Sequence, residues 1–266
     1  MIPYAHLHVH SYYSLLDGQA SIARLVDKAL ADGMRGMALT DHGNMMGVKD
    51  FYNYVNKKKV AAAKEKKAEE AQLTALRDGT YENAPDKKGV NPDAGKTNEE
   101  LIAECEKQIE KAQRVLDFKP IYGCEMYCAR RTKSDKKDKT DRSGWHLIVL
   151  AKNETGYHNL IKLVSRSWVD GFYMKPRTDK ADLERFKEGL IVSSACLGGE
   201  IPRKILSGDL QGAEEAVRWF KQVFGEDYYL ELQRHEVKDP AQRANRETYP
   251  MQAQANKALL QLAEKC

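Results

Sequence analysis

The sequence predicts an α/β protein in which short strands alternate with amphipathic helices. Short apolar runs recur along the chain, and most are followed by a polar turn and a segment with helical apolar spacing. This alternation predicts parallel βαβ units, arranged either as an open doubly wound sheet or as a barrel. A length of 266 residues fits one barrel-sized domain or two ordinary ones.

The individual elements follow from the apolar pattern and from the residues that end helices. The first helix is expected to end at Gly33, because glycine readily adopts the left-handed conformation that closes a helix. The expected strands are residues 4–10, 36–40, 120–129, 147–151, 189–194 and 228–232. The expected helices are residues 21–32, a stretch from about Met45, and residues 157–168, 210–224 and 249–265.

Residues 57–117 interrupt this rhythm, because Lys, Glu and Ala dominate them. Two helix-like pieces flank residues 78–98, which are rich in Gly, Pro, Asn and Asp. Thr97 and Glu100 have the spacing of a capping box at the start of the second piece. We therefore predict a helical hairpin inserted within a single domain that spans residues 1–266. A solvated surface excursion and a docking arm are both open interpretations of it.

Composition excludes several classes of protein. Hydrophobic residues make up 42% of the chain and charged residues 31%, which permits a folded core. No apolar run approaches the ~20 residues of a membrane span, and the N-terminus lacks the pattern of a signal peptide. Five cysteines, an odd number, favour the reducing cytoplasm. The net charge of +4 permits a nucleic-acid partner without indicating one.

Histidines alternate in the first expected strand. His6, His8 and His10 would lie on one face of that strand, where neutral imidazoles can converge on a metal ion. A polar strand edge is the alternative. Asp17 follows in the next loop and supplies a carboxylate just before Gly18.

Two further candidates lie at or within later strands. His42 follows the strand 36–40, at the end where functional residues gather in βα folds, although a turn or helix cap would also explain it. Glu125 lies inside an apolar strand, and burying a carboxylate is costly unless it is paired or binds a metal. A solvent-facing edge strand is the alternative for Glu125.

His146 and Cys196 complete the candidate set. Cys196 could be a metal-bound thiolate, a nucleophile with a histidine base, or a small buried residue. Taken together, these histidines, carboxylates and the cysteine predict a site for more than one divalent cation, which suits phosphoester cleavage. Neither a P-loop nor a Gly-x-Gly-x-x-Gly motif occurs.

Seven ordered motifs resemble one known family. They are HLHVHSYYSLLDG (6–18), LTDHGNM (39–45), PIYGCEMY (120–127), HLIVLAKN (146–153), GFYMKPR (171–177), SSACLGGEI (193–201) and YLELQRH (229–235). Together the motifs are similar to the polymerase and histidinol phosphatase (PHP) domain at the N-terminus of bacterial DNA polymerase III alpha subunits. The resemblance covers the chain apart from the inserted hairpin.

The resemblance implies a distorted (β/α)7 TIM-like barrel that holds up to three divalent ions, which would be zinc, manganese or iron. A metal-bound hydroxide would be the nucleophile, with no side-chain nucleophile, and His6 would lie in the barrel interior. Arg130, Arg131 and Lys175 are candidates for neutralising the substrate. The metal ligands carried over by motif are His8, His10, Asp17, His42, Glu125, His146 and Cys196.

The chain departs from the family pattern in two respects. The hairpin falls where related polymerases pass directly from a helix to the strand that carries Glu125. In addition, no Asp-x-His pair of the kind found on the family's last barrel strand occurs in the sequence. We therefore expect a fragment of a longer polymerase subunit that lacks this strand and its two ligands.

The resemblance also implies a function in DNA replication. The parent would be a DNA-directed DNA polymerase (a nucleotidyltransferase), and this domain a metal-dependent phosphodiesterase with 3′–5′ exonuclease (proofreading) activity. The implied partners are the 3′ end of DNA, the rest of the polymerase chain and other replicase subunits, including a separate exonuclease, with no membrane. The alternative is a non-catalytic module that braces the polymerase and docks that exonuclease. A free-standing histidinol-phosphate phosphatase is disfavoured by GFYMKPR.

Overall fold

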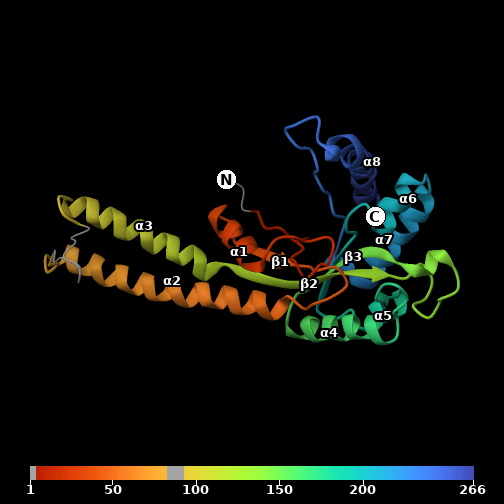
Figure 1. Cartoon of the computed structure of the whole chain (residues 1–266), viewed down its shortest axis with the longest axis horizontal. Coiled ribbons are helices and arrows are strands. Elements are labelled where there is room, and N and C mark those ends of the chain that lie inside the picture. Colours follow the sequence, from red (N-terminus) through yellow and green to blue (C-terminus); the bar gives the residue numbers. More distant parts are fainter. Residues whose placement is uncertain (1–3, 83–92) are drawn as a thin grey trace. The chain divides into compact units, whose positions relative to one another are not determined.

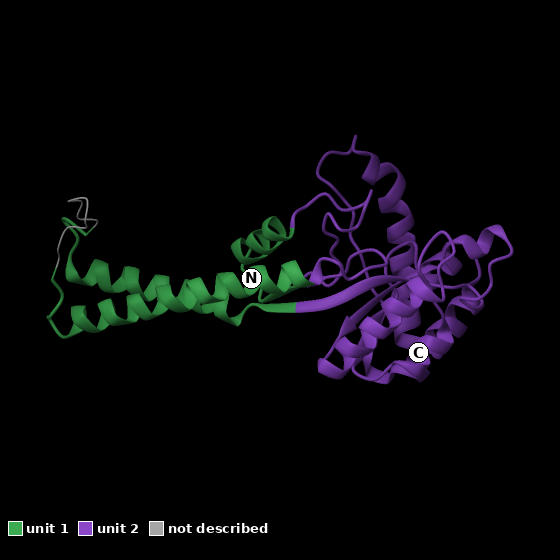
Figure 2. Cartoon of the chain, turned by 60° about the horizontal axis from the view of Figure 1, so that its bottom comes forward, with its two compact units in different colours: residues 1–5, 22–37, 49–120 green, residues 6–21, 38–48, 121–266 purple. Residues whose placement is uncertain are grey.

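The computed structural model describes residues 4–82 and 93–266, and the tip of the expected 78–98 loop falls partly outside them. The chain forms two compact units (Figure 2). Unit 1 consists of Met1–Ala5, Ile22–Met37 and Lys49–Pro120. Unit 2 consists of His6–Ser21, Ala38–Val48 and Ile121–Cys266. Each unit is described by itself below.

Unit 1 is built on three helices, α1 (Ile22–Ala31), α2 (Val48–Arg77) and α3 (Asn98–Asp117). Helices α2 and α3 run side by side as a hairpin (Figure 1), and hydrogen bonds join Lys66 to Gln113 and Arg77 to Glu106. The predicted capping box is confirmed, because the Thr97 hydroxyl accepts from the Glu100 N–H while the Glu100 carboxylate accepts from the Thr97 N–H.

A mixed six-stranded sheet has the order β1-β2-β3-β5-β6, with β4 paired to β2. Strands β2 and β3 are antiparallel, as are β3 and β5, whereas β2–β4 and β5–β6 are parallel. The strands are β1 (Gly36–Leu39), β2 (Lys119–Cys128), β3 (Trp145–Ala151), β4 (Arg177–Thr178), β5 (Leu190–Ser193) and β6 (Tyr228–Tyr229).

The prediction of uniformly parallel βαβ units is therefore wrong, and the barrel is not confirmed. Parallel neighbours need a long crossover, usually a helix, whereas only a loop with one 3-10 turn, Lys139–Arg142, connects β2 to β3. These two strands consequently run in opposite directions. Across the described residues the sheet is open, with β1 and β6 at its ends.

The prediction of a first strand over residues 4–10 is also wrong. Residues 4–10 form no regular strand, although the Ala38 N–H donates to the His6 carbonyl and the Thr40 N–H to the Val9 carbonyl. These hydrogen bonds are isolated, so residues 4–10 do not form a continuous strand ladder with β1. His6 is exposed and does not lie in a barrel interior.

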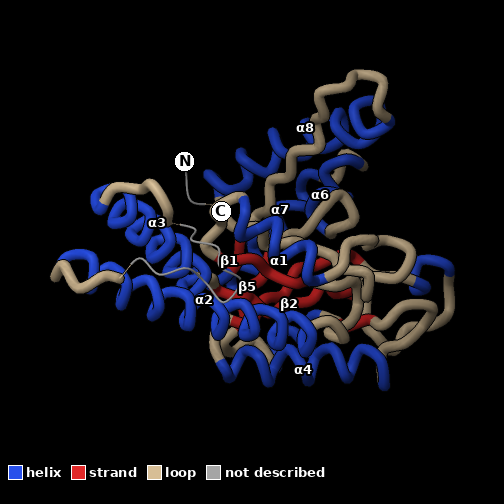
Figure 3. Tube along the Cα trace, turned by 60° about the vertical axis from the view of Figure 1, so that its left-hand side comes forward, coloured by secondary structure: helices blue, strands red, loops and turns tan. Residues whose placement is uncertain are grey.

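The main core lies on one face of the sheet. Cys124, Met126 and Cys128 of β2 point into it with alternating register. Helices of unit 2 flank the strands (Figure 3). The helices of unit 2 are α4 (Glu154–Val169), α5 (Lys180–Arg185), α6 (Glu200–Leu206), α7 (Leu210–Phe224) and α8 (Arg243–Lys265), with a 3-10 turn at Gly225–Asp227.

Among the described residues no helix is long and apolar enough to span a bilayer.

Candidate metal centre

The register of the sheet places the first two candidate ligands on the face opposite the main core. Glu125 lies between Cys124 and Met126 in β2, so its side chain projects to the other side. Tyr127 is directly opposite His146 of β3, and cross-strand partners share a face. His146 is near the start of β3, which begins at Trp145, two residues before the apolar run that predicted this strand.

Asp41, which the sequence did not single out, organises the loop that carries the N-terminal candidates. Its carboxylate is buried and accepts hydrogen bonds from the Ser11 N–H and from the hydroxyls of Ser11 and Ser14. The Ser14 hydroxyl in turn accepts from the His42 N–H. At Gly18, any Cβ would lie 2.0 Å from the Ser11 carbonyl oxygen, so this close approach needs glycine.

Four imidazoles converge on the Glu125 carboxylate, whose side chain is only 1% exposed. Nε2 of His8 lies 3.3 Å from Oε1 of Glu125, and Nδ1 of His146 lies 3.0 Å from the same oxygen. Nε2 of His10 lies 2.9 Å from Oε2 of Glu125, and Nδ1 of His42 contacts that oxygen as well. His8 and His10 come from one N-terminal segment, His42 follows β1 and His146 lies in β3, so the cluster is a product of tertiary folding.

The last two candidates lie at the edge of this cluster. Sγ of Cys196 is 3.5 Å from Oε1 of Glu125 and 3.4 Å from Nδ1 of His146. Asp17 is half-exposed and contacts Nδ1 of His10. All seven candidate residues are thus gathered in one region of unit 2, and their role as metal ligands stays a prediction.

The protonation of the cluster depends on Glu125. Burial opposes ionisation of Glu125, but the imidazoles around it, that of His10 first among them, outweigh this effect and hold the pKa of Glu125 well below its usual range. Burial by itself would lower the pKa of His8, but hydrogen bonds to Glu125 and Glu231 raise that pKa to about 10. Burial, and then the charge of Glu125, raise the pKa of Cys196 to about 12. A thiol that remains protonated at neutral pH is a poor nucleophile.

These residues fit a site for divalent metal ions. The buried Nε2 atom of His10 has no hydrogen-bond partner among the described residues, although it faces Oε2 of Glu125. Imidazole nitrogens and carboxylate oxygens are ligands that zinc, manganese and iron accept. Three groups have ligand atoms close enough to share an ion: His8 with His10 and Glu125, His10 with Asp17 and His42, and His42 with Glu125 and His146.

Glu231 is a residue of this site that the sequence analysis missed. Its Oε1 atom lies 2.7 Å from Nδ1 of His8. This contact favours the tautomer that carries the proton on Nδ1, so the lone pair of Nε2 is on the side of Glu125. Ser193 donates to Glu231 at 2.7 Å and Gln233 at 2.6 Å. The available signal was a glutamate inside the expected strand 228–232, the same kind of signal that identified Glu125.

The three candidate substrate-binding cations lie in different surroundings. Nζ of Lys175, which is exposed, lies 5.5 Å from the ring centroid of Tyr127, and that ring contacts His42 and His146. Lys175 therefore lies beside the cluster. The guanidinium of Arg130 instead stacks over the Trp145 ring, 3.9 Å from its centroid.

Two cations of the basic loop are paired with carboxylates. Arg131 forms ion pairs with Asp135, Asp138 and Asp141. Nζ of Lys133 donates a hydrogen bond to Asp182. Carboxylates therefore neutralise Arg131 and Lys133, and Arg131 is a weaker candidate than Lys175 for binding a phosphate.

Comparisons with known proteins identify the family of this chain. The profile of the PHP domain family matches residues 6–235. The DNA polymerase III subunit alpha of Borreliella burgdorferi is 42% identical over 237 residues, which are 89% of this chain and 16% of the relative. The corresponding subunits of Treponema pallidum and Campylobacter jejuni are 37% and 34% identical over 87% and 90% of this chain, and 15% and 16% of the relatives.

The chain therefore belongs to the PHP domain family, and its curated relatives are alpha subunits of DNA polymerase III. It spans about one-sixth of the length of those relatives.

Proposed function

We propose that this chain is the PHP domain of a DNA polymerase III alpha subunit and that it hydrolyses phosphodiester bonds at the 3′ end of DNA. The observation that carries the proposal is the convergence of four imidazoles and a thiol on the buried Glu125 carboxylate. Divalent ions bound there would lower the pKa of a water molecule and neutralise charge on a phosphate.

Each group of the chain has a separate task in this proposal. Glu125 places one carboxylate within reach of several imidazoles, which suits a shared ligand between ions. Glu231 holds His8 in the tautomer that directs Nε2 toward Glu125. Lys175, exposed beside Tyr127, is placed to attract the anionic strand toward the site. Cys196, with Sγ 3.5 Å from Oε1 of Glu125, would serve as a metal ligand in this proposal and not as the nucleophile.

The direct test is degradation of 3′-labelled single-stranded DNA in the presence of Mn²⁺ or Zn²⁺. We expect the double variant His8→Ala/His10→Ala to lose activity by at least about 100-fold, because two of the imidazoles are removed. The control is His158→Ala, since this side chain belongs to α4 and pairs with Glu154 instead of Glu125. Equal activity of the His8/His10 variant and the unmodified chain would refute the proposal.

The alternative function is a non-catalytic module in which bound ions only cross-link the fold. It is favoured by the wide separation of the cluster's residues in the sequence, from His8 to Cys196, because ions at such a site would staple several segments together. Metal analysis, chelation and nuclease assays on one preparation distinguish the two. Bound metal with strong destabilisation by chelator and no cleavage would favour the module, which could then brace the polymerase or dock a separate exonuclease.

The cellular setting of the proposal is bacterial replication in the cytoplasm. The relatives' name supports partners among DNA and the other replicase subunits, with the rest of a polymerase chain as the covalent partner. All five cysteines are free thiols, which suits a reducing compartment.

A further inference from the structure

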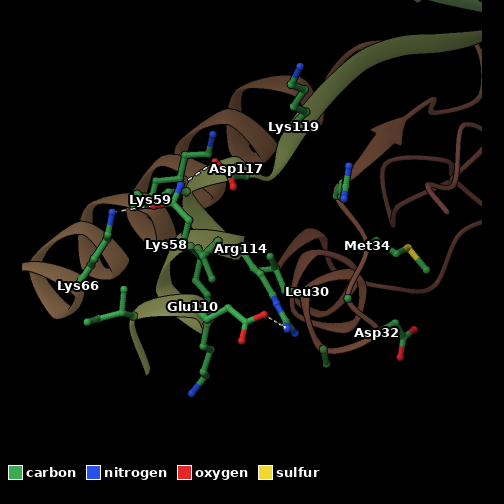
Figure 4. Close-up of a pocket in the computed structure, with 18 of the residues that line it drawn as sticks. Leu30, Asp32, Met34, Lys58, Lys59, Lys66, Glu110, Arg114, Asp117 and Lys119 are labelled. Atoms are coloured by element: carbon green, nitrogen blue, oxygen red, sulfur yellow. Dashed lines mark hydrogen bonds and ion pairs between the residues drawn. The ribbon is translucent and has the colours of Figure 1, made fainter. Parts of the chain in front are cut away.

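Unit 1 contains a broad groove that the metal centre does not use. Its volume is about 2100 Å³, and it is lined by α1 and the turn after it, by α2, by α3 and by the first residue of β2 (Figure 4). We call it the arm groove. It is larger than the ~300–1,000 Å³ of typical small-molecule sites and is open to solvent, so its shape suits a polymer better than a metabolite.

The carboxylates of the arm groove are already satisfied. Figure 4 shows one of these pairs, Glu110 with Arg114. Every acidic residue that lines the groove has a hydrogen-bond or ion-pair partner: Asp27 has Lys58, Asp32 has Lys28, Glu70 has Lys66, Glu106 has Arg77, Glu110 has Arg114, and Asp117 has Gln113.

Four cations of the groove have no such partner. Arg35, Lys59, Lys111 and Lys119 line it, and none pairs with a carboxylate among the residues that the structure describes. Arg35, Lys111 and Lys119 are exposed, and Lys59 is half-buried. The groove thus carries a surplus of positive charge that the fold does not compensate.

The sequence of the hairpin concentrates this charge at one end. Residues 57–67 contain six lysines and one glutamate, a formal charge of +5. Residues 69–106 contain ten carboxylates and four cations, a formal charge of −6. Like charges close together on a helix are destabilising, so the basic end is held at some cost to the free-standing fold. A polyanion in the groove would remove that cost.

We propose that the arm groove binds DNA through its backbone phosphates. Uncompensated lysines and arginines in an open groove are what sequence-independent phosphate binding needs. Five of the six carboxylates beside them pair with a cation, and Asp117 accepts from an amide. The choice of DNA over other polyanions rests on the proposed function. The binding itself does not depend on the metal centre, because all groove residues belong to unit 1 and all cluster residues to unit 2.

The test measures binding of a short fluorescent duplex by anisotropy over a range of salt concentrations, with EDTA present so that no hydrolysis occurs. The variant Lys59→Gln/Lys111→Gln/Lys119→Gln removes three of the unpartnered cations. We expect roughly tenfold weaker binding at low salt, and a slope of log K against log salt that is less steep by about 3, since each phosphate contact contributes ~0.9.

The matched control is Lys187→Gln/Lys238→Gln/Lys257→Gln, which changes the net charge equally through exposed lysines of unit 2. Its slope should stay within about 1 of the unmodified chain. Circular dichroism confirms that both variants fold. Three results would overturn the proposal: no DNA binding by the unmodified chain at low salt, equal loss in the control, or tighter binding of poly-glutamate than of DNA, which would indicate an acidic protein instead.

A failure of the proposed hydrolysis gives a different pattern. In that case the His8→Ala/His10→Ala variant and the unmodified chain would both be inactive, while the effect of the groove variant on DNA binding would persist.

Discussion

Two buried carboxylates in unit 2 show different ways of keeping a negative charge inside a protein. Asp141, in the loop between β2 and β3, is 3% exposed and accepts from the Arg131 guanidinium and from the N–H groups of Lys137 and Asp138. Glu125, in β2, is 1% exposed and faces imidazoles. Guanidinium and N–H groups are permanent donors, so Asp141 is complete without any addition. Imidazoles supply positive charge only when protonated, so Glu125 needs protons or a cation. The first carboxylate is structural and the second can serve a reaction.

The loop that holds Asp141 should be the more sensitive region to a single substitution. Arg177 is fully buried, and its guanidinium donates to the carbonyls of Lys133, Asp135, Asp141 and Gly171. Arg177→Leu leaves these acceptors unsatisfied, and we expect unfolding to become easier by about 4 kcal/mol. Urea unfolding measures this change.

The control for that substitution is Arg246→Leu, at an exposed position of α8, which should change the free energy of unfolding by no more than about 0.5 kcal/mol. A similar small change in Arg177→Leu would mean that its hydrogen bonds do not hold the loop.

Glu125→Gln should remove the response of the fold to metal. For the unmodified chain we expect saturating Zn²⁺ or Mn²⁺, at about 100 times the dissociation constant, to add about 2.7 kcal/mol to the free energy of unfolding. The variant keeps the size of the side chain but loses the charge, so this gain should disappear. Thermal unfolding with and without metal, together with metal content, measures it. Glu236→Gln, at an exposed position, is the control. Undiminished metal content in Glu125→Gln would contradict the proposed centre.

Glu231→Gln tests whether the carboxylate that contacts Nδ1 of His8 affects metal binding. An amide at this position can donate to Nδ1 of His8, which would favour the tautomer that protonates Nε2, the atom facing Glu125. Metal affinity should fall by about 10- to 100-fold, the usual cost of losing such a partner. Calorimetric titration gives the affinity, and nitrogen chemical shifts of His8 report the tautomer. An unchanged tautomer and affinity would assign Glu231 a purely structural part.

The smallest effect should come from Arg131→Gln and should appear in the pH dependence of stability. Hydrogen bonds from Arg131, and then from backbone N–H groups, outweigh burial and lower the pKa of Asp141 to about 2. Because this folded pKa is below the ordinary value of about 3.9, the stabilisation is present above pH ~4 and is lost as the pH falls toward 2. In the variant the pKa of Asp141 should rise, so the two stability curves should differ at neutral pH and converge near pH 2. Denaturant titrations at several pH values test this, and parallel curves throughout would contradict it.

The helices and the inserted hairpin were predictable because their signals are local. The capping box of Thr97 and Glu100 and the apolar spacing of residues 210–224 lie within a few turns of chain, and both helices form as expected. The antiparallel direction of β3 was missed because alternating strands and helices were taken as parallel units. The sequence predicts no α-helix between residues 129 and 145, and this was the available warning.

The sequence by itself determined which side chains could hold cations, because an alternating histidine segment and a carboxylate inside an apolar strand are anomalies visible without coordinates. Only the tertiary structure decided where their charges are balanced. It brought Glu231 next to Nδ1 of His8, which is 223 positions away in the sequence, and it paired Arg131 with neighbouring aspartates. The reason is physical: local spacing fixes the face on which a side chain lies, whereas the partner that satisfies a buried charge is chosen by long-range packing.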